Sequence, residues 1–323
     1  GNTFNRQRIW TAGSNKIIMK KILIVGTVAY DDIETNKGNS GKILGGAGTY
    51  IALACSHFNS KTSVVSVVGG DFDKKHLELL ENKGIDTSPI EIVSEGKTFY
   101  WKGKYHKDWN KRDTLATELN VLADFNPIVP KEFKESKIVV LGNLHPIVQG
   151  AVLDQLLKTP EYIILDTMNF WMDTALLELQ KIIARVDIIV INDDEAMQLS
   201  GKESLFAAAE KILKLGPKYV VIKKGEHGSM LFGDGEFFVT PAYPVKEVID
   251  PTGAGDTFAG GFGGYLSEQD ELSFENLKNA IIFGTVMASF CVESFGTSSM
   301  ETLKKEEVLD RLRNFKKLTT YSF

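Results

Sequence analysis

Short continuous runs of aliphatic and β-branched residues recur along the chain and alternate with segments of helical spacing. The runs cover residues 21–26, 62–69, 137–142, 162–166, 187–192 and 219–225, and the helical segments cover 47–58, 74–82, 148–157, 175–184 and 205–215. Runs without polar alternation are typical of strands that are buried on both faces of a parallel sheet. The sequence therefore predicts a doubly wound, mostly parallel α/β sheet with helices on both faces.

Two polar segments, 30–44 and 92–109, interrupt this alternation. Both are too polar for core strands, and both are too rich in glycine, threonine and aromatic residues for helices. Each lies where a βα unit would otherwise close, so we expect the two segments to form a small separate β-sheet. Such a sheet would be a lid over the C-terminal edge of the main sheet, where α/β folds bind ligands. An ordinary long surface loop is the alternative for each segment.

Charge and composition exclude several classes of protein. The formal net charge of -5 repels a phosphate backbone, so no nucleic acid partner is expected. No run approaches the roughly 18 apolar residues that cross a bilayer, so no membrane association is expected. The two cysteines, Cys55 and Cys291, lie in apolar runs and are expected to be buried thiols, which suits a cytoplasmic protein.

The first 18 residues are polar and aperiodic, whereas Met19 opens a run, MKKILIVG, that leads directly into a predicted strand. We expect residues 1–18 to be a leader or an extension outside the fold. Residues 19–323 then form one α/β domain, with lid segments near 30–44 and 92–109.

The segment DPTGAGDTFAGGF, residues 250–262, carries the strongest chemical signal. Gly253, Ala254 and Gly255 follow a turn and precede a helical run, so their N–H groups can converge at a helix N-terminus. Unpaired amides and the positive end of the helix dipole favour a phosphate or a developing negative charge there. Asp256 either caps the helix or faces the cleft, where it can take a proton from a hydroxyl. The local sequence leaves both alternatives open.

A second glycine cluster, LGGAGTY at residues 44–50, also leads into a helix. Gly45, Gly46 and Gly48 would let the backbone approach a polyhydroxylated ligand closely, or they would form a tight turn with close helix packing. Neither cluster completes a Walker loop or the GxGxxG dinucleotide fingerprint. Two common nucleotide-binding signatures are therefore absent from the sequence.

Four motifs in order, GTVAYD, LGGAGTY, VGGDF and DPTGAGDTFAGGF, resemble those of the ribokinase or PfkB family of carbohydrate and nucleoside kinases. The resemblance spans residues 20–313. It implies an ATP-dependent phosphotransferase with a ribokinase-like, doubly wound α/β domain and a small β-sheet lid. It also implies Mg²⁺ as a cofactor, a sugar or nucleoside with a primary hydroxyl as the acceptor, and a homodimer formed through the lid.

Carried over position by position, the resemblance assigns roles to residues at both ends of the chain. Asp256 matches the family's catalytic base, and the amides of residues 253–255 match its anion hole, which stabilises the charge of the transferred phosphoryl group. Asp31 resembles the acidic residue that holds acceptor hydroxyls, although it would also suit a turn. The three glycines of LGGAGTY resemble those that line the sugar pocket.

The nucleotide site is implied in the same way. Asn192 and Glu195 fit the NxxE pattern that organises magnesium and phosphate, although an Asn before acidic residues also caps helices. The motif KKGEHG resembles a nucleotide-binding loop in which Gly225 and Gly228 give backbone access to ATP. Lys224 of the same motif would reach a phosphate, with a solvated lysine as the alternative.

A cation site is implied by a third set of residues. Asp250, Thr252 and Gly296 resemble a loop that binds a monovalent cation such as K⁺ in some family members. Oxygen ligands suit a hard cation, but hydrogen-bonded turns would give the same sequence. The five histidines show no metal-ligand spacing.

The sequence departs from ribokinases proper at Ala29 and Tyr50, where those proteins tend to carry Asn. The change removes polar partners for sugar hydroxyls and places an aromatic ring at the substrate site. The second lid segment is also aromatic, with Phe99, Tyr100, Trp101, Tyr105 and Trp109. A flat ligand such as a nucleobase would pack on such residues, which equally suit a lid core or a dimer interface. Sugar and nucleoside acceptors both stay open.

Three functions are compatible with an α/β fold of this kind. The leading hypothesis is a kinase that transfers the γ-phosphoryl group of ATP to a sugar or nucleoside. A catalytically silent sensor that binds nucleotide or sugar is the alternative, which Asp256 disfavours because binding alone requires no carboxylate beside an anion site. An NAD-dependent oxidoreductase lacks the dinucleotide fingerprint, and the fold alone would not establish it.

Overall fold

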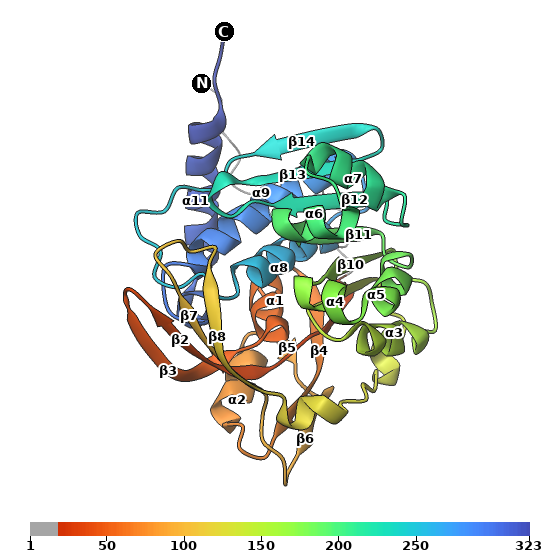
Figure 1. Cartoon of the computed structure of the whole chain (residues 1–323), viewed down its shortest axis with the longest axis vertical. Coiled ribbons are helices and arrows are strands. Elements are labelled where there is room, and N and C mark those ends of the chain that lie inside the picture. The colour runs from red at the N-terminus through yellow and green to blue at the C-terminus, as the bar shows by residue number, and fades with distance from the viewer. Residues whose placement is uncertain (1–18) are drawn as a thin grey trace.

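The computed structural model describes residues 19–323, whose main body is a mostly parallel β-sheet covered by helices on both faces (Figure 1). Within these residues the main sheet has ten strands in the order β14-β13-β12-β11-β10-β9-β1-β4-β5, and β6 pairs with β4. The strands are β1 (Lys20–Val25), β4 (Ser60–Gly69), β5 (Ile85–Asp86), β6 (Ile90–Val93), β9 (Ile138–Leu141), β10 (Tyr162–Asp166), β11 (Ile188–Asn192), β12 (Tyr219–Lys223), β13 (Ser229–Gly233) and β14 (Glu236–Thr240). Only the pairs that involve β13 and β14 are antiparallel. The predicted fold class is confirmed, and the predicted extension at 1–18 lies outside the described residues.

Helices on the two faces of the sheet close two separate hydrophobic cores. On β1 the side chains of Ile22 and Ile24 enter one core, and those of Leu23 and Val25 enter the other. The first core is closed by α1 (Ala47–Cys55), α2 (Lys74–Asn82), α8 (Ala254–Ser267), α9 (Phe274–Cys291), α10 (Ser298–Thr302) and α11 (Lys305–Thr319). The second core is closed by α3 (Pro146–Asp154), α4 (Asn169–Thr174), α5 (Leu176–Ile183), α6 (Asp193–Ser200) and α7 (Leu205–Leu213). Burial on both faces explains why the strands are apolar without alternation.

A second sheet of four strands forms the lid beside the main body (Figure 1). Its order is β3-β2-β7-β8, and its strands are β2 (Ala29–Thr35), β3 (Gly38–Gly45), β7 (Tyr100–Tyr105) and β8 (Arg112–Glu118). The polar segment 30–44 forms β2 and β3, whereas the segment 92–109 contributes only β7. Residues 92 and 93 end β6 in the main sheet, and β8 lies further along the chain. The sequence of β8, RDTLATE, has no apolar period that would mark it as a strand.

Three short 3₁₀ turns complete the described elements: η1 (Asn120–Asp124), η2 (Lys131–Phe133) and η3 (Gly225–His227). No helix of the described chain is both long and apolar enough to span a bilayer. Cys55 and Cys291 are buried and unpaired, as their apolar neighbours predict. Burial raises the pKa of each thiol to about 12, so neither is a reactive thiolate near neutral pH.

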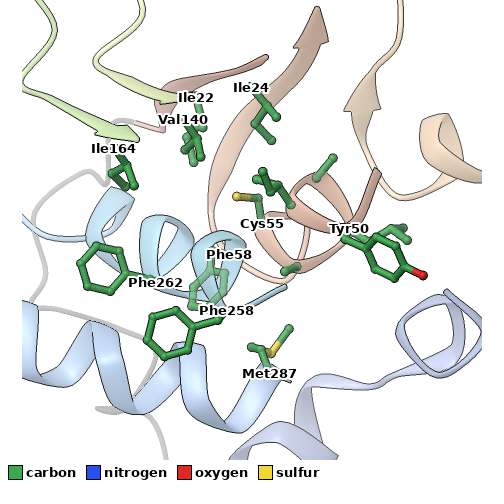
Figure 2. Close-up of a cluster of buried hydrophobic side chains, with 14 of the residues drawn as sticks. Ile22, Ile24, Tyr50, Cys55, Phe58, Val140, Ile164, Phe258, Phe262 and Met287 are labelled. Carbon is green, nitrogen blue, oxygen red and sulfur yellow. The ribbon is translucent and has the colours of Figure 1, made fainter. Parts of the chain in front are cut away.

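Close packing of α8 on α1 sets the position of the α8 N-terminus. A Cβ on Gly260 would overlap the carbonyl oxygen of Ile51 and would lie 2.7 Å from the Cβ of Ala54, both in α1. Phe258 and Phe262 of α8 point into the core between the sheet and the neighbouring helices (Figure 2). Gly260 therefore lets α8 lie directly on α1, while the aromatic side chains of α8 fill the core between the sheet and the neighbouring helices.

We predict that Gly260→Ala lowers the free energy of unfolding by about 1–3 kcal/mol, because the added methyl group meets backbone atoms of α1. Overpacking should outweigh the gain in helix propensity of up to about 1 kcal/mol. Gly263→Ala on the same helix is the control, since its Cβ would lie 3.2 Å from the flexible Cδ1 of Ile164. Urea unfolding at equal m-values compares the variants, and equal stabilities would contradict the packing argument.

Candidate active site

Four polar residues lie where the carboxyl ends of the central strands approach the N-terminus of α8. Asp166 ends β10, Asn192 ends β11 and Lys223 ends β12, while Asp256 lies in the first turn of α8. Parallel strands expose their carboxyl ends at one edge of the sheet, which is where α/β folds bind ligands. The sheet topology therefore brings together residues that are far apart in the sequence.

The first turn of α8 holds the glycines that the sequence placed at an anion hole. Gly253 is the N-cap, with a φ of 78° in the left-handed region. The amide of Ala254 donates to the carbonyl of Pro251 at 3.2 Å, whereas the amides of Gly255 and Asp256 have no acceptor within the helix. An anion at this end of α8 would meet first-turn amides and the positive end of the helix dipole.

Asp256 does not cap α8. The helix has no side-chain cap bond, and the carboxyl group of Asp256 is hydrogen-bonded to that of Asp166. Burial and the charge of Asp166 raise the pKa of Asp256 to about 8, and burial raises the pKa of Asp166 as well. Two carboxyl groups in contact do not both ionise readily, so the pair shares a proton near neutral pH.

Lys223 is the cation closest to this carboxyl pair. Its Nζ lies 3.9 Å from Oδ1 of Asp166, and a Cβ on Gly255 would lie 2.8 Å from the same Nζ. The positive charge of Lys223 lowers the pKa of both carboxyl groups against the larger effect of burial. The sequence pointed to Lys224 instead, because two adjacent lysines at a strand end do not reveal which one faces α8.

Asn192 and Glu195 form a capping box that starts α6. Oδ1 of Asn192 accepts from the amide of Glu195 at 2.8 Å, and Oε2 of Glu195 accepts from the amide of Asn192 at 2.8 Å. The capping role considered for this pair is therefore observed. Glu195 is also only 7% exposed, and burial raises its pKa to about 7 while Lys223 opposes and Asp166 adds to the shift. The carboxyl group of Glu195 is therefore close enough to Lys223 and Asp166 to interact with their charges.

Asp31 is buried on β2 of the lid, next to the loop that opens α1. Its carboxylate accepts a hydrogen bond from the backbone of Gly46, and a Cβ on Gly45 would overlap it. Gly48, further along, packs on the backbone of the residue that follows β1. Burial and the charge of Asp250 raise the pKa of Asp31 to about 7. The glycines of this loop therefore allow the backbone to approach both the carboxylate and the end of β1.

Tyr50 lies beneath the turn that precedes α8. Its side chain is 1% exposed, and its ring fills the space where Gly253 has no side chain. Its hydroxyl points away from the other labelled core residues (Figure 2) and has no hydrogen-bond partner within the described residues. The charges of Asp31 and Asp250 act on this hydroxyl. Tyr50 thus supports the turn from below instead of lining an open pocket.

The lid hairpin reaches across the site to the loops on both sides of it. Oγ1 of Thr252, in the turn before α8, donates to the hydroxyl of Tyr105 at 3.1 Å. At the tip of the hairpin, Oδ1 of Asn110 lies 3.1 Å from the position of a Cβ on Gly225, in the turn after β12. The lid therefore covers the carboxyl edge of the sheet in this structure.

Arg112, the first residue of β8, is a second site residue that the sequence did not reveal. Its Nη1 donates to the hydroxyl of Tyr105 at 3.5 Å. Its positive charge acts on the carboxyl groups of Asp31, Glu195 and Asp256, which come from three separate parts of the chain. A single arginine at the start of a polar strand carries no local signal, and only the placement of the lid brings it to the site.

The turn after β12 contains the residues that the sequence placed at a nucleotide-binding loop. Gly225 and Gly228 have φ values of 55° and 89°, in the region that favours glycine. The amide of Lys224 donates to the carbonyl of Gly228 at 2.7 Å and closes the turn around η3. The turn lies directly after Lys223, so it borders the site.

Asp250 is fully buried in the loop before α8. Its carboxylate accepts from the amide of Thr252 at 2.9 Å and from the amide of Gly296 at 2.8 Å. The hydrogen-bonded turn that the sequence left as an alternative is therefore observed, and burial raises the pKa of Asp250. Within residues 19–323, no group of three or more His, Cys, Asp or Glu side chains is arranged to hold a metal ion.

The chain is similar to known proteins over most of its length. The chain matches the pfkB family of carbohydrate kinases over residues 19–303. It is 31% identical over 275 residues to the cytidine kinase of Thermococcus kodakarensis, an alignment that covers 81% of this chain and 96% of that protein. It is 29% identical over 315 residues to the nucleoside kinase of Methanothermobacter thermautotrophicus, with 87% and 92% covered.

Solved structures with the same fold include two from this group of kinases. The nucleoside kinase of Methanocaldococcus jannaschii, an archaeal member of the ribokinase family, superposes with a TM-score of 0.74 at 22% identity, covering 92% of this chain and 99% of that one. A putative ribokinase II from E. coli gives 0.79 at 18% identity, covering 92% and 100%. These likenesses show the ribokinase fold. With the family match over most of its length, the chain belongs to the PfkB family of carbohydrate kinases and is a carbohydrate or nucleoside kinase.

Proposed function

We propose that the protein transfers the γ-phosphoryl group of ATP to a primary hydroxyl of a nucleoside, with Asp256 as the base that takes the hydroxyl proton. The observation that carries the proposal is the position of Asp256 in the first turn of α8, beside amides without helical acceptors and next to Lys223. Its pKa, raised to about 8, brings the carboxyl group into the range where a general base works best near neutral pH.

The proposed acceptor is a nucleoside and not a free sugar. The two relatives described above are named for cytidine and for nucleosides. Ala29 and the buried Tyr50 offer a free sugar no amide partners, while Asp31 keeps a carboxylate for the hydroxyls of a ribose ring. The competing hypothesis is that the acceptor is a free sugar, which carries no nucleobase.

In the proposed reaction the acceptor lies between Asp31 and Asp256. Asp31 binds ribose hydroxyls, so that the primary hydroxyl points toward Asp256. The hydroxyl oxygen attacks the γ-phosphorus, Asp256 takes the proton, and the bond from the γ-phosphorus to its bridging oxygen breaks to release ADP. The amides of the proposed anion hole at residues 253–255, at the N-terminus of α8, and the ammonium group of Lys223 stabilise the charge on the transferred phosphoryl oxygens.

ATP is proposed to lie across the ends of β11 and β12. The backbone at Gly225 and Gly228 borders the nucleotide, and Lys224 contacts a phosphate from the same turn. Mg²⁺, when bound, would neutralise phosphate charge, and hard oxygen donors suit it. The buried carboxyl groups of Glu195 and Asp166 are such donors, and the capping box with Asn192 fixes the Glu195 side chain in place.

A monovalent cation such as K⁺ at Asp250, Thr252 and Gly296 is a finer part of the proposal. The buried charge of Asp250 acts on Asp31 and Tyr50, and a nearby cation would offset it. Equal rates with K⁺, with Na⁺ and with a large organic cation would argue against this site.

A homodimer through the lid is the other finer part of the proposal. The outer face of the lid carries ion pairs, Lys102 with Asp32 at 3.4 Å and Lys104 with Glu34 at 2.7 Å. Exposed pairs of this kind contribute little to stability, so a partner could rearrange them at low cost. The mass measured by light scattering decides between monomer and dimer.

ADP release over a panel of nucleosides and free sugars tests the function as a whole. A kinase releases ADP only with its acceptors present, and we expect cytidine or another nucleoside to give the highest rate. Nucleotide binding without ADP release for any acceptor would favour the catalytically silent sensor.

We predict that Asp256→Asn lowers kcat by roughly 10²- to 10⁴-fold while the Kd of ATP stays nearly constant, because the amide accepts no proton in the transition state. The kcat/KM of the unchanged protein should rise with pH toward about 8 as Asp256 loses its proton, and the variant should lack this limb. Asp270→Asn, an exposed site beyond the other end of α8, is the matched control. Wild-type turnover in Asp256→Asn would remove the residue from the reaction.

We predict that Asp31→Asn raises the KM of the acceptor by about 10- to 100-fold, since hydrogen bonds to a charged group contribute roughly 1.5–3 kcal/mol. The KM of ATP should change little because Asp31 lies on the lid side of the site. Asp32→Asn is the control, because Asp32 is on the opposite face of β2 and pairs with Lys102. An unchanged acceptor KM would place the acceptor elsewhere.

We predict that Lys223→Met lowers kcat by about 10²-fold, the effect of removing one donor to developing negative charge. Lys218→Met is a matched control with the same change of charge, since Lys218 precedes β12 at its opposite end and pairs with Asp187 at 3.1 Å. The kcat and the Tm of both variants are measured together. A loss of Tm without a loss of kcat would show that Lys223 is structural only.

A further inference from the structure

Asp71, in the loop that follows β4, is hydrogen-bonded to the residue that leads into the lid hairpin, and we infer that it is a positioning residue for acceptor binding. Its Oδ1 accepts from the amide and from Oγ1 of Thr98, each at 2.7 Å. Thr98 is 1% exposed and lies two residues before β7. The inference rests on the proposed function, which gives the acceptor hydroxyls to Asp31.

Both ends of the β7–β8 hairpin are tied at Thr98. Its Oγ1 also accepts from the amide of Gly69, the last residue of β4, at 3.0 Å. Its carbonyl accepts from Nδ2 of Asn120, just after β8, at 2.9 Å. The chain thus enters β7 and returns from β8 through one hydrogen-bonded joint, formed by residues 69–71, 98 and 120, in which Asp71 supplies the contact from the main sheet.

The glycines of the VGGDF motif let the chain that leads to the lid lie directly on the end of β4. A Cβ on Gly69 would overlap the carbonyl oxygen of Gly96, and a Cβ on Gly70 would overlap that of Ser94. Backbone therefore meets backbone at this crossing. The motif combines two residues that allow this close approach with a carboxylate, that of Asp71, which fixes the chain just before it enters the lid.

The joint leads directly into the strand pair that carries Asp31. Phe99 follows Thr98, and its carbonyl accepts from the amide of Tyr30 on β2 at 2.9 Å. Asp31 is the next residue of β2. The hydroxyl of Tyr30 accepts from the amide of Asp73 at 2.9 Å, so the same loop after β4 also holds β2. A shift of Thr98 would therefore move the paired strands and displace the Asp31 carboxylate relative to α8.

The oxygen atom of Asp71 matters more for the joint than its charge. Its Oδ2 lies 3.9 Å from Nζ of Lys42 on β3, and both side chains are partly exposed. Exposed ion pairs contribute little, whereas loss of the bonds to the buried Thr98 would leave polar groups unpaired. Asp71→Asn, which keeps an oxygen acceptor, should therefore preserve the joint, and Asp71→Ala should not.

The test measures the Kd of cytidine and of ribose by equilibrium titration, and the KM of each acceptor and of ATP by ADP release. Asp71→Ala should raise the Kd and KM of the acceptor about 3- to 30-fold, the range for residues that influence a site without touching its ligand. The KM of ATP should change less than about 2-fold. Thr98→Val, which removes one of the two bonds, should act in the same direction but less strongly.

Two further variants separate positioning from stability. Asp73→Ala is the matched control, because Asp73 caps α2 by accepting from the amide of Lys75 at 3.0 Å. It should lower the Tm without changing the acceptor Kd. Asp31→Asn combined with Asp71→Ala should have nearly the acceptor Kd of Asp31→Asn alone, because a residue that acts through Asp31 has no effect once that carboxylate is gone.

Weaker acceptor binding in Asp71→Ala, restored in Asp71→Asn and not additive with Asp31→Asn, supports the inference. An unchanged acceptor Kd in Asp71→Ala would overturn it, as would an equal rise in the KM of ATP or full additivity with Asp31→Asn. A wild-type protein that binds an acceptor but releases no ADP would defeat the proposed kinase function, while weaker acceptor binding in Asp71→Ala would still support the positioning role.

Discussion

The burial of several carboxyl groups at one edge of the sheet is the constraint on which the site depends. Asp166, Glu195 and Asp256 lie together there, and removing a carboxylate from water costs several kcal/mol unless charge or hydrogen bonds compensate it. Three features of the fold do so: the N-termini of α6 and α8, where Glu195 and Asp256 lie in the first turn, and the ammonium group of Lys223. The same features attract phosphate, so the groups that stabilise the buried acids also create an anion site.

The lid joins two halves of this site that the main sheet keeps apart. Its strand β2 supplies Asp31 next to the glycine loop of α1, and its hairpin between β7 and β8 reaches the turn before α8 through Tyr105 and the turn after β12 through Asn110. A closed lid also excludes water, which strengthens each charge interaction beneath it. In the proposed function, acceptor recognition and phosphoryl transfer would therefore be coupled through a single small sheet.

The main sheet was predictable because each central strand is buried on both faces and so reads as an unbroken apolar run. The strand β8 was not predictable, because RDTLATE is exposed and pairs with β7 through its backbone. Backbone pairing of an exposed strand requires no pattern of apolar side chains. The site divides in the same way. Asp256 and its glycines could be found because a turn and a helix start have local sequence patterns. Lys223 could not be found because its role depends on which face of the strand end its side chain occupies, and Arg112 could not because its role depends on where the lid hairpin lies. These depend on contacts between distant parts of the chain, which no local pattern contains.

The carboxyl pair also distinguishes a site that transfers phosphate from one that only holds it. A negative charge a few ångströms from a phosphate weakens its binding, so the pair of Asp166 and Asp256, which stays negative while it shares one proton, works against the attraction of Lys223 and the α8 amides. In a sensor this repulsion would only lower the affinity for phosphate. In the proposed reaction this repulsion is relieved, because an ionised Asp256 becomes neutral when it takes the proton of the attacking hydroxyl. An interaction that is less unfavourable in the transition state than in the ground state raises the rate. The arrangement is therefore better suited to moving a phosphoryl group than to retaining one.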